Sequence, residues 1–149
     1  MIAAIALGSN IGDRRAHLDF AVSRLRTLLD DLKVSRYYET TPVSAAESPL
    51  FLNAAAVGET ALSAHALLDK LLAIEHEHGR ARPYPNAPRT LDLDLILFGD
   101  AVIEEPGLFV PHPRFRERRF VLEPLAEIAP GVIDPVTQLT AAELLHRIS

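Results

Sequence analysis

The chain has 149 residues, 48% of them hydrophobic and 23% charged, with a formal net charge of −5 and no cysteine. This length and composition predict one folded domain over residues 1–149 that needs no disulfide staples, and the lack of cysteine excludes thiolate metal sites. The acidic balance argues against a nucleic-acid binder, and no apolar run approaches the ~18 residues of a membrane span.

The first residues predict a buried strand, a tight turn and a helix. Residues 2–7 are apolar and lack the basic region of a signal peptide, so we expect a cytoplasmic protein. The turn Gly8-Ser9-Asn10 has no P-loop or dinucleotide spacing, which favours a structural role over phosphate binding. Asp13 is a suitable N-cap for the helix. The apolar stripe of this helix is expected to contain Leu18, Val22, Leu25, Leu29 and Leu32.

Two further strands are predicted around a loop at residues 41–49. Residues 33–40 alternate and are rich in Val and Tyr, and residues 51–57 place Phe51 and Asn53 on one face of a strand. The Asn53 amide must find partners on this apolar strand. It either bonds to backbone at a sheet edge or works with Phe51 to hold a flat heterocycle.

A second helix is predicted from its N-cap Ser63 to Gly79. Its last turn contains His76 and His78, which suggests a metal site. Residues two apart on a helix do not face each other, so we favour a solvated helix end.

The next strand, at residues 89–98, carries two carboxylates. Side chains alternate along a strand, so Asp92 and Asp94 share a face with Cα atoms about 7 Å apart, which suits a pair of hard cations. The opposite face is expected to carry Leu91, Leu93, Leu95 and Leu97. The alternative is a pair of solvated acids that form salt bridges with arginine.

Arginines flank this strand on both sides. Seven of the fifteen Lys and Arg residues of this acidic chain fall between positions 80 and 119. Guanidinium groups bind phosphate oxygens and carboxylate-held Mg²⁺ bridges them, so the combination favours polyphosphate chemistry over either feature alone. The loop at residues 80–90 is a candidate lid over such a site.

The C-terminal part adds a turn at Gly99-Asp100, a short return strand at residues 102–103, a partly helical stretch at 120–128 and a helix opened by a capping box from Thr140 to Glu143. The order strand, helix, strand, strand, helix, strand predicts an α+β fold, a ferredoxin-like β-α-β-β-α-β sandwich with a C-terminal extension.

Several motifs together resemble the 6-hydroxymethyl-7,8-dihydropterin pyrophosphokinases of folate biosynthesis. They are Gly8-Ser9-Asn10, Phe51-Leu52-Asn53, Gly79-Arg80-Ala81-Arg82, Arg89-Thr90-Leu91-Asp92-Leu93-Asp94 and Val110-Pro111-His112 followed by Arg118 and Phe120. The resemblance runs from the first strand to about residue 130. It implies transfer of a pyrophosphoryl group from ATP to the pterin's hydroxymethyl oxygen, with release of AMP, by an enzyme expected to be monomeric.

The resemblance also implies roles for single residues. Asp92 and Asp94 match the ligands of two Mg²⁺ ions, and Asp94, Arg80 and Arg82 match catalytic positions. ATP contacts are implied for Glu75, Arg80, Arg82, Arg89, His112 and Arg118. Pterin contacts are implied for Thr40, Thr41, Val43, Phe51, Asn53, Asp92 and Phe120. The proline-rich loop at 83–88, which looks shortened, and Pro113 depart from the family pattern and put lid motion and ATP affinity in doubt.

Two other classes of protein fit parts of the pattern. A ligand-sensing module on the same fold would not need paired acids ringed by arginines. A Mg²⁺-dependent phosphoesterase would use the acids but would have no need of Phe51, Asn53 and Phe120 around a heterocycle.

Overall fold

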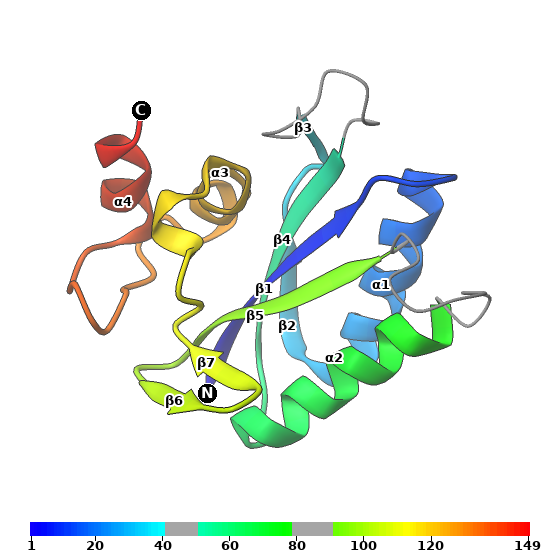
Figure 1. Cartoon of the computed structure of the whole chain (residues 1–149), viewed down its shortest axis with the longest axis horizontal. Coiled ribbons are helices and arrows are strands. Elements are labelled where there is room, and N and C mark those ends of the chain that lie inside the picture. Colours follow the sequence, from blue (N-terminus) through cyan, green and yellow to red (C-terminus); the bar gives the residue numbers. More distant parts are fainter. Residues whose placement is uncertain (41–50, 79–90) are drawn as a thin grey trace.

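A sheet with the strand order β2-β4-β1-β5 separates two layers of helices (Figure 1). The computed structural model describes residues 1–40, 51–78 and 91–149. The elements in chain order are β1 (Ile2–Ser9), α1 (Arg14–Leu28), β2 (Asp30–Val34), β3 (Tyr38–Thr40), β4 (Phe51–Glu59), α2 (Ala64–His78), β5 (Asp92–Phe98), β6 (Ile103–Glu105), β7 (Leu108–Val110), the 3₁₀ turn η1 (Phe115–Glu117), α3 (Arg119–Ile128) and α4 (Ala141–Arg147).

The topology is the predicted ferredoxin-like one. Central strand β1 pairs antiparallel with β4 and β5, and β4 also pairs antiparallel with β2 and with the short β3. Taking β2 and β3 as one interrupted strand, the sheet contains the four strands of a β-α-β-β-α-β sandwich. The α+β prediction with a C-terminal extension is confirmed.

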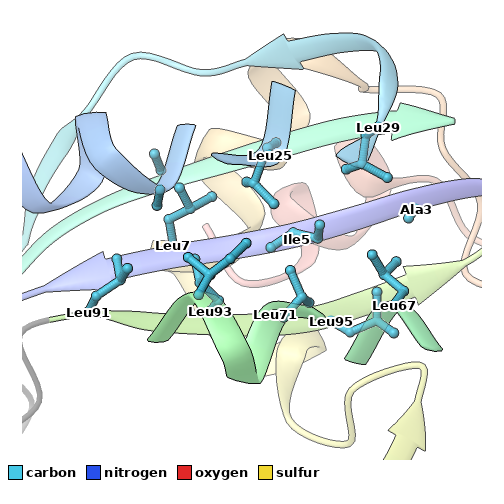
Figure 2. Close-up of a cluster of buried hydrophobic side chains, with 14 of the residues drawn as sticks. Ala3, Ile5, Leu7, Leu25, Leu29, Leu67, Leu71, Leu91, Leu93 and Leu95 are labelled. Atoms are coloured by element: carbon cyan, nitrogen blue, oxygen red, sulfur yellow. The ribbon is translucent and has the colours of Figure 1, made fainter. Parts of the chain in front are cut away.

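Helices α1 and α2 cover one face of the sheet (Figure 1). Alternation along β1 sends Ala3, Ile5 and Leu7 into this layer, where they meet leucines of both helices and of β5 (Figure 2). Burying each such leucine or isoleucine contributes about 1.5–3 kcal/mol. Both helices begin where the sequence predicts, because Asp13 Oδ1 accepts from the Ala16 N–H at 3.1 Å and Ser63 Oγ accepts from the Ala66 N–H at 3.1 Å.

Helices α3 and α4 cover part of the opposite face. Small residues of the sheet, Ala4 and Ala55, lie under α3 and form a second core with its buried Val121, Leu122 and Leu125. The capping box predicted at Thr140 is present and opens α4. This layer leaves part of the sheet face, at the C-terminal end of β1, for a pocket.

Two sequence predictions about the first helix and second strand are wrong in detail. The strand predicted at 33–40 is two strands, because buried Ser35 leaves the ladder to exchange hydrogen bonds with Ala55 through its N–H and its Oγ. Leu32 belongs to β2 and not to the helix stripe. The helix ends at the C-cap Leu29, and Asp31 then takes a positive φ of 52°.

The alternation predicted for β5 also fails at its C-terminal end. The pairing of β1 with β5 shifts register between Ala4 and Ile5, which inserts Ile96 as a bulge. Leu97 therefore faces the α3 layer, while Leu93 and Leu95 face α2 as predicted. Among the described residues, no helix combines the length and apolarity that crossing a membrane requires.

Candidate functional site

A pocket of about 870 Å³ lies on the α3 side of the sheet, where β1 ends and β4 and β5 begin. The sheet and β3 contribute the lining residues Ala6, Leu7, Gly8, Thr40, Phe51, Asn53, Asp92 and Asp94. The other wall is Arg114, Glu117, Arg118, Arg119, Phe120 and Val121, from η1, α3 and the residues that flank η1. The pocket thus combines apolar, acidic and basic surfaces.

One cross-strand row builds the floor of the pocket. Gly8 is paired with Asn53 on β4 and with Asp92 on β5, so an amide and a carboxylate flank a residue that has no side chain. A Cβ at position 8 would lie 3.2 Å from Asn53 Oδ1. Asn53 is 5% exposed, and its Nδ2 donates to Thr40 Oγ1 at 2.5 Å. The amide is therefore held in a fixed orientation beside Gly8.

Two aspartates place carboxylate oxygens on the sheet side of the pocket. Asp92 and Asp94 are opposite Gly8 and Ala6 of β1 and both line the pocket, as the alternation of a strand predicts. The described residues contain no group of three His, Cys, Asp or Glu side chains suited to a metal. Two carboxylates fit Mg²⁺, which usually binds through one or two carboxylates and completes its shell with water and substrate phosphates.

The arginines of the opposite wall differ in their partners. Arg114 pairs with Glu117 at 2.9 Å and Arg119 pairs with Glu123 at 2.9 Å, both on the surface. Within the described part of the chain, Arg118 has no acidic partner at ion-pair distance, and its guanidinium carbon lies 5.6 Å from the centre of the Phe120 ring. Arg118 is therefore available to an anionic ligand.

The surroundings of His112 favour the neutral form of its imidazole ring. Burial lowers its pKa, and the positive charges of Arg118 and Arg114 lower it further, while Asp94 acts in the opposite direction. Its Nδ1 accepts a hydrogen bond from the Arg114 N–H at 3.2 Å. The ring proton is therefore assigned to Nε2, which can donate to a phosphate oxygen.

Comparisons with known proteins show the family and the fold of the chain. Residues 4–130 match the family model described as 7,8-dihydro-6-hydroxymethylpterin-pyrophosphokinase. The chain belongs to this family. It is 49% identical to the 2-amino-4-hydroxy-6-hydroxymethyldihydropteridine pyrophosphokinase of Bacillus subtilis over 88% of this chain and 80% of that one. The corresponding enzyme of Pseudomonas aeruginosa is 42% identical over 86% of this chain and 80% of that one.

Longer relatives contain the family domain as a part. The chain is 37% identical to the folic acid synthesis protein fol1 of Pneumocystis carinii over 97% of its own length, which is only 20% of that protein. The Plasmodium falciparum HPPK-DHPS crystal structure superposes with a TM-score of 0.79 at 15% identity, over 98% of this chain and 44% of that one, which supports the fold. The predictions of a pyrophosphokinase and of its family are confirmed.

The structure brings together seven of the residues that the pyrophosphokinase resemblance implies. These are Thr40, Phe51, Asn53, Asp92, Asp94, Arg118 and Phe120. His112 lies next to them, within the electrostatic influence of Asp94 and Arg118. Thr41, Val43, Arg80, Arg82 and Arg89 lie outside the described residues, as does the candidate lid at 80–90.

Glu75 has a different environment. It is 7% exposed, and its Oε2 accepts from the backbone N–H of Leu93 at 2.6 Å. Leu93 lies between the two aspartates on an edge strand, so this carboxylate holds the strand that carries them. The bond is a positioning contact and is compatible with further contacts of Glu75.

The structure corrects the expectation of a solvated end for α2. His76 is exposed as expected, but His78 is half-buried, with its Nε2 2.5 Å from His17 Nδ1 and its ring stacked on Phe20 at 4.4 Å. Sequence reasoning assigned no specific site role to seven of the lining residues: Ala6, Leu7, Gly8, Arg114, Glu117, Arg119 and Val121. Only the pairing of Gly8 with both Asn53 and Asp92 reveals its place, and this register is not visible in a sequence.

Proposed function

We propose that the chain transfers a pyrophosphoryl group from ATP to the hydroxymethyl oxygen of 6-hydroxymethyl-7,8-dihydropterin, with two Mg²⁺ ions, and releases AMP. One observation carries the proposal. A single pocket joins the buried Asn53 amide and two phenylalanines to a pair of aspartates and to Arg118, which has no acidic partner at ion-pair distance among the described residues. A heterocycle and a polyphosphate therefore find complementary groups within one volume.

The pterin end of the pocket is formed by Asn53, Phe51 and Phe120. The ordered amide of Asn53 can hydrogen-bond the polar edge of the ring, and Asn53 is oriented by Thr40. Phe51 from β4 and Phe120 from α3 offer aromatic surface for stacking on the ring. We assign Thr41 and Val43 backbone contacts on the strength of the family resemblance alone.

The phosphate end is formed by Asp92, Asp94, Arg118 and His112. The pterin hydroxyl oxygen attacks the β-phosphorus of ATP in line, the bond from that phosphorus to the α–β bridging oxygen breaks, and AMP departs with this oxygen. The hydroxyl proton leaves to Asp94 or to water. Asp92 and Asp94 would hold Mg²⁺, which when bound would supply positive charge to the phosphates of ATP. Arg118 and the His112 N–H bind phosphate oxygens.

Further ATP contacts are assigned to Arg80, Arg82, Arg89 and Glu75 by the resemblance. Arg80 and Arg82 are also assigned catalytic roles. Glu75 contributes through the strand it holds, because its bond to the Leu93 N–H fixes the backbone between the two metal ligands. The monomeric state, the single domain and the cytoplasmic location stay predictions.

An assay of AMP formation tests the proposal. The purified chain is incubated with Mg²⁺ and ATP, with and without 6-hydroxymethyl-7,8-dihydropterin, and AMP and the pterin diphosphate are quantified. We expect equal amounts of both products, and none without the pterin. AMP release that does not depend on the pterin would indicate a phosphoesterase, and no AMP under either condition would indicate a binding module.

A further inference from the structure

A buried ion pair lies outside the pocket, behind its arginine wall. The Asp134 side chain is 0% exposed, and both its oxygens accept from Arg116, Oδ1 from Nη2 at 2.9 Å and Oδ2 from Nε. Asp134 also accepts from the Val136 N–H at 3.0 Å and from Thr137 Oγ1 at 2.7 Å. The carboxylate therefore has four hydrogen bonds, two of them from one guanidinium fork.

The turn that holds Asp134 is itself ordered by backbone hydrogen bonds. The Asp134 N–H donates to the Leu139 carbonyl at 2.9 Å, and the Gln138 N–H donates to the Asp134 carbonyl at 2.8 Å. The turn leads into the capped helix α4. Asp134 lies beyond residues 4–130, which match the family model, so the family assignment gives it no role.

Arg116 lies in the middle of the residues that face the nucleotide end of the pocket. Arg114 and Arg118, two positions before and after it, both line the pocket, while Arg116 reaches back to Asp134. These residues surround η1, a 3₁₀ turn of three residues. A 3₁₀ turn this short has too few hydrogen bonds to hold its own orientation. Burial of Phe115 and the fork from Arg116 to Asp134 supply the outside anchors.

Stability alone is a poor explanation of this pair. Burying the Asp134 carboxylate is unfavourable, since only Arg116 of the pair keeps contact with solvent, and replacing an ion pair with a buried member by apolar residues is often neutral or stabilising. The fork differs from an apolar contact in fixing direction, because two parallel hydrogen bonds define the plane and angle of the guanidinium. Arg116 lies between Arg114 and Arg118 in the chain, so the angle fixed by this fork also influences the orientation of these two arginines.

The pterin end has independent support. Phe120 is carried by α3, which is held to the sheet by buried Val121, Leu122 and Leu125. Asn53 and Phe51 belong to β4, on the other side of the pocket. A change at Asp134 should therefore displace the arginine side chains more than it displaces these three residues, although Arg118 contacts the Phe120 ring.

We propose that Asp134 is a positioning residue for nucleotide binding: through its buried fork with Arg116 it sets the direction in which Arg114 and Arg118 enter the pocket. The inference rests on the proposed function, in which this end of the pocket binds the phosphates of ATP. Asp134 also removes Arg116 from competition for those phosphates, since both of its carboxylate oxygens are bound to the guanidinium.

The test separates nucleotide binding from pterin use. Calorimetry with Mg²⁺ and α,β-methylene-ATP, which keeps the scissile bridge intact, measures nucleotide affinity directly, and steady-state kinetics give the KM values for ATP and for the pterin. The variants are Asp134→Asn, Arg116→Lys and the double variant Arg116→Met with Asp134→Leu. Arg24→Gln, which removes an exposed ion pair between α1 and α2, is the matched control. Thermal unfolding checks that each variant folds.

We expect nucleotide affinity and KM for ATP to weaken roughly tenfold in Asp134→Asn and in the double variant, with the pterin KM changed by less than about twofold. The nucleotide affinity of Arg116→Lys should lie between that of these variants and that of the control, because lysine keeps the positive charge but cannot form the two parallel hydrogen bonds. If Asp134→Asn does not fold, the double variant, which leaves no unpaired buried charge, decides the matter.

Two results would overturn the inference. The first is an unchanged nucleotide affinity in any folded variant that lacks the fork. The second is an equal weakening of the nucleotide affinity and of the pterin KM, which would show that the ion pair only stabilises the fold. The proposed function fails separately, if wild type and Arg24→Gln form no pterin-dependent AMP. Direct binding of the nucleotide analogue still tests Asp134 in that case.

Discussion

At the level of single residues, the pocket concentrates negative charge on one strand. Asp92 and Asp94 lie on one face of β5 with no described third acid or histidine to complete a metal cage. Two like charges on one face of a strand repel each other, and a bound cation relieves this repulsion. The pair therefore suits a cationic ligand.

Replacing one aspartate tests this arrangement. Asp94→Ala should reduce pterin-dependent AMP formation to background, because the variant lacks one of the two carboxylates that would hold Mg²⁺ at the phosphates. The melting temperature in the absence of metal should hold or rise, since like-charge repulsion is removed. Asp100→Ala, in the exposed turn after β5, is the control for loss of an acid. Activity of Asp94→Ala near that of the control would refute the metal assignment.

The second prediction at the level of single residues concerns Gly8, which has no side chain. A Cβ there would lie 3.2 Å from Asn53 Oδ1, so Gly8→Ala should displace the amide from its position in the row. We expect the pterin KM to rise about tenfold with a much smaller change in KM for ATP. Gly131→Ala is the matched control, because nothing lies within 4 Å of its added Cβ. Equal pterin KM values for the two variants would contradict the proposed pterin end.

At the level of elements, sequence patterns predict what is local and miss what depends on a partner. The caps at Asp13, Ser63 and Thr140 are read correctly, because each is satisfied within one turn of chain. The bulge at Ile96 is missed, because it exists only in the pairing of β5 with β1. The same limit applies to the site.

The acidic pair on β5 is visible in the sequence, since two residues on one strand define it. Two other contacts require the tertiary structure. Glu75 accepts a hydrogen bond from the Leu93 N–H, and Asp134 pairs with Arg116. No local sequence pattern marks either acid as buried, although the family resemblance implies an ATP contact for Glu75. In the folded chain both acids are buried, and each accepts a hydrogen bond from a residue 18 positions away.

The contact between the ends of α1 and α2 carries a pH prediction. Burial lowers the pKa of His78, and the neighbouring His17 lowers it further, while Glu77 opposes the shift. His78 therefore binds a proton less readily in the folded chain than in the unfolded chain, where its pKa is about 6.5. As the pH falls from this value through the lower pKa of the folded chain, the free energy of unfolding decreases.

His17→Gln removes one of the two causes that lower the pKa of His78. Between about pH 8 and about pH 5, the decrease in the free energy of unfolding should therefore be smaller for this variant than for wild type. Urea unfolding at a series of pH values measures this difference. His76→Gln, an exposed histidine on the same helix, is the control and should follow wild type. A His17→Gln curve parallel to wild type would show that the pair contributes nothing to acid sensitivity.

At the level of the whole molecule, the sheet separates two layers with different consequences for the site. The layer of α1 and α2 packs against Ile5, Leu93 and Leu95 on the face away from the pocket (Figure 2). The layer of α3 and α4 packs on the pocket's own face and carries Phe120 into it. Packing defects in the two layers should therefore differ in function, even where they are equal in stability.

Two leucines allow a matched comparison. Leu71 on α2 and Leu122 on α3 are both 0% exposed, so each Leu→Ala change should lower the free energy of unfolding by about 2–5 kcal/mol. Leu71→Ala should leave both KM values unchanged at a temperature where it is fully folded, because the sheet lies between the cavity and the pocket. Leu122→Ala lies two residues from Phe120 on the same helix and should raise the pterin KM several-fold. Chemical denaturation of both variants measures the loss of stability, and steady-state kinetics measure the two KM values. An equal change of the pterin KM in both variants would show that the sheet does not isolate the site from the layer of α1 and α2.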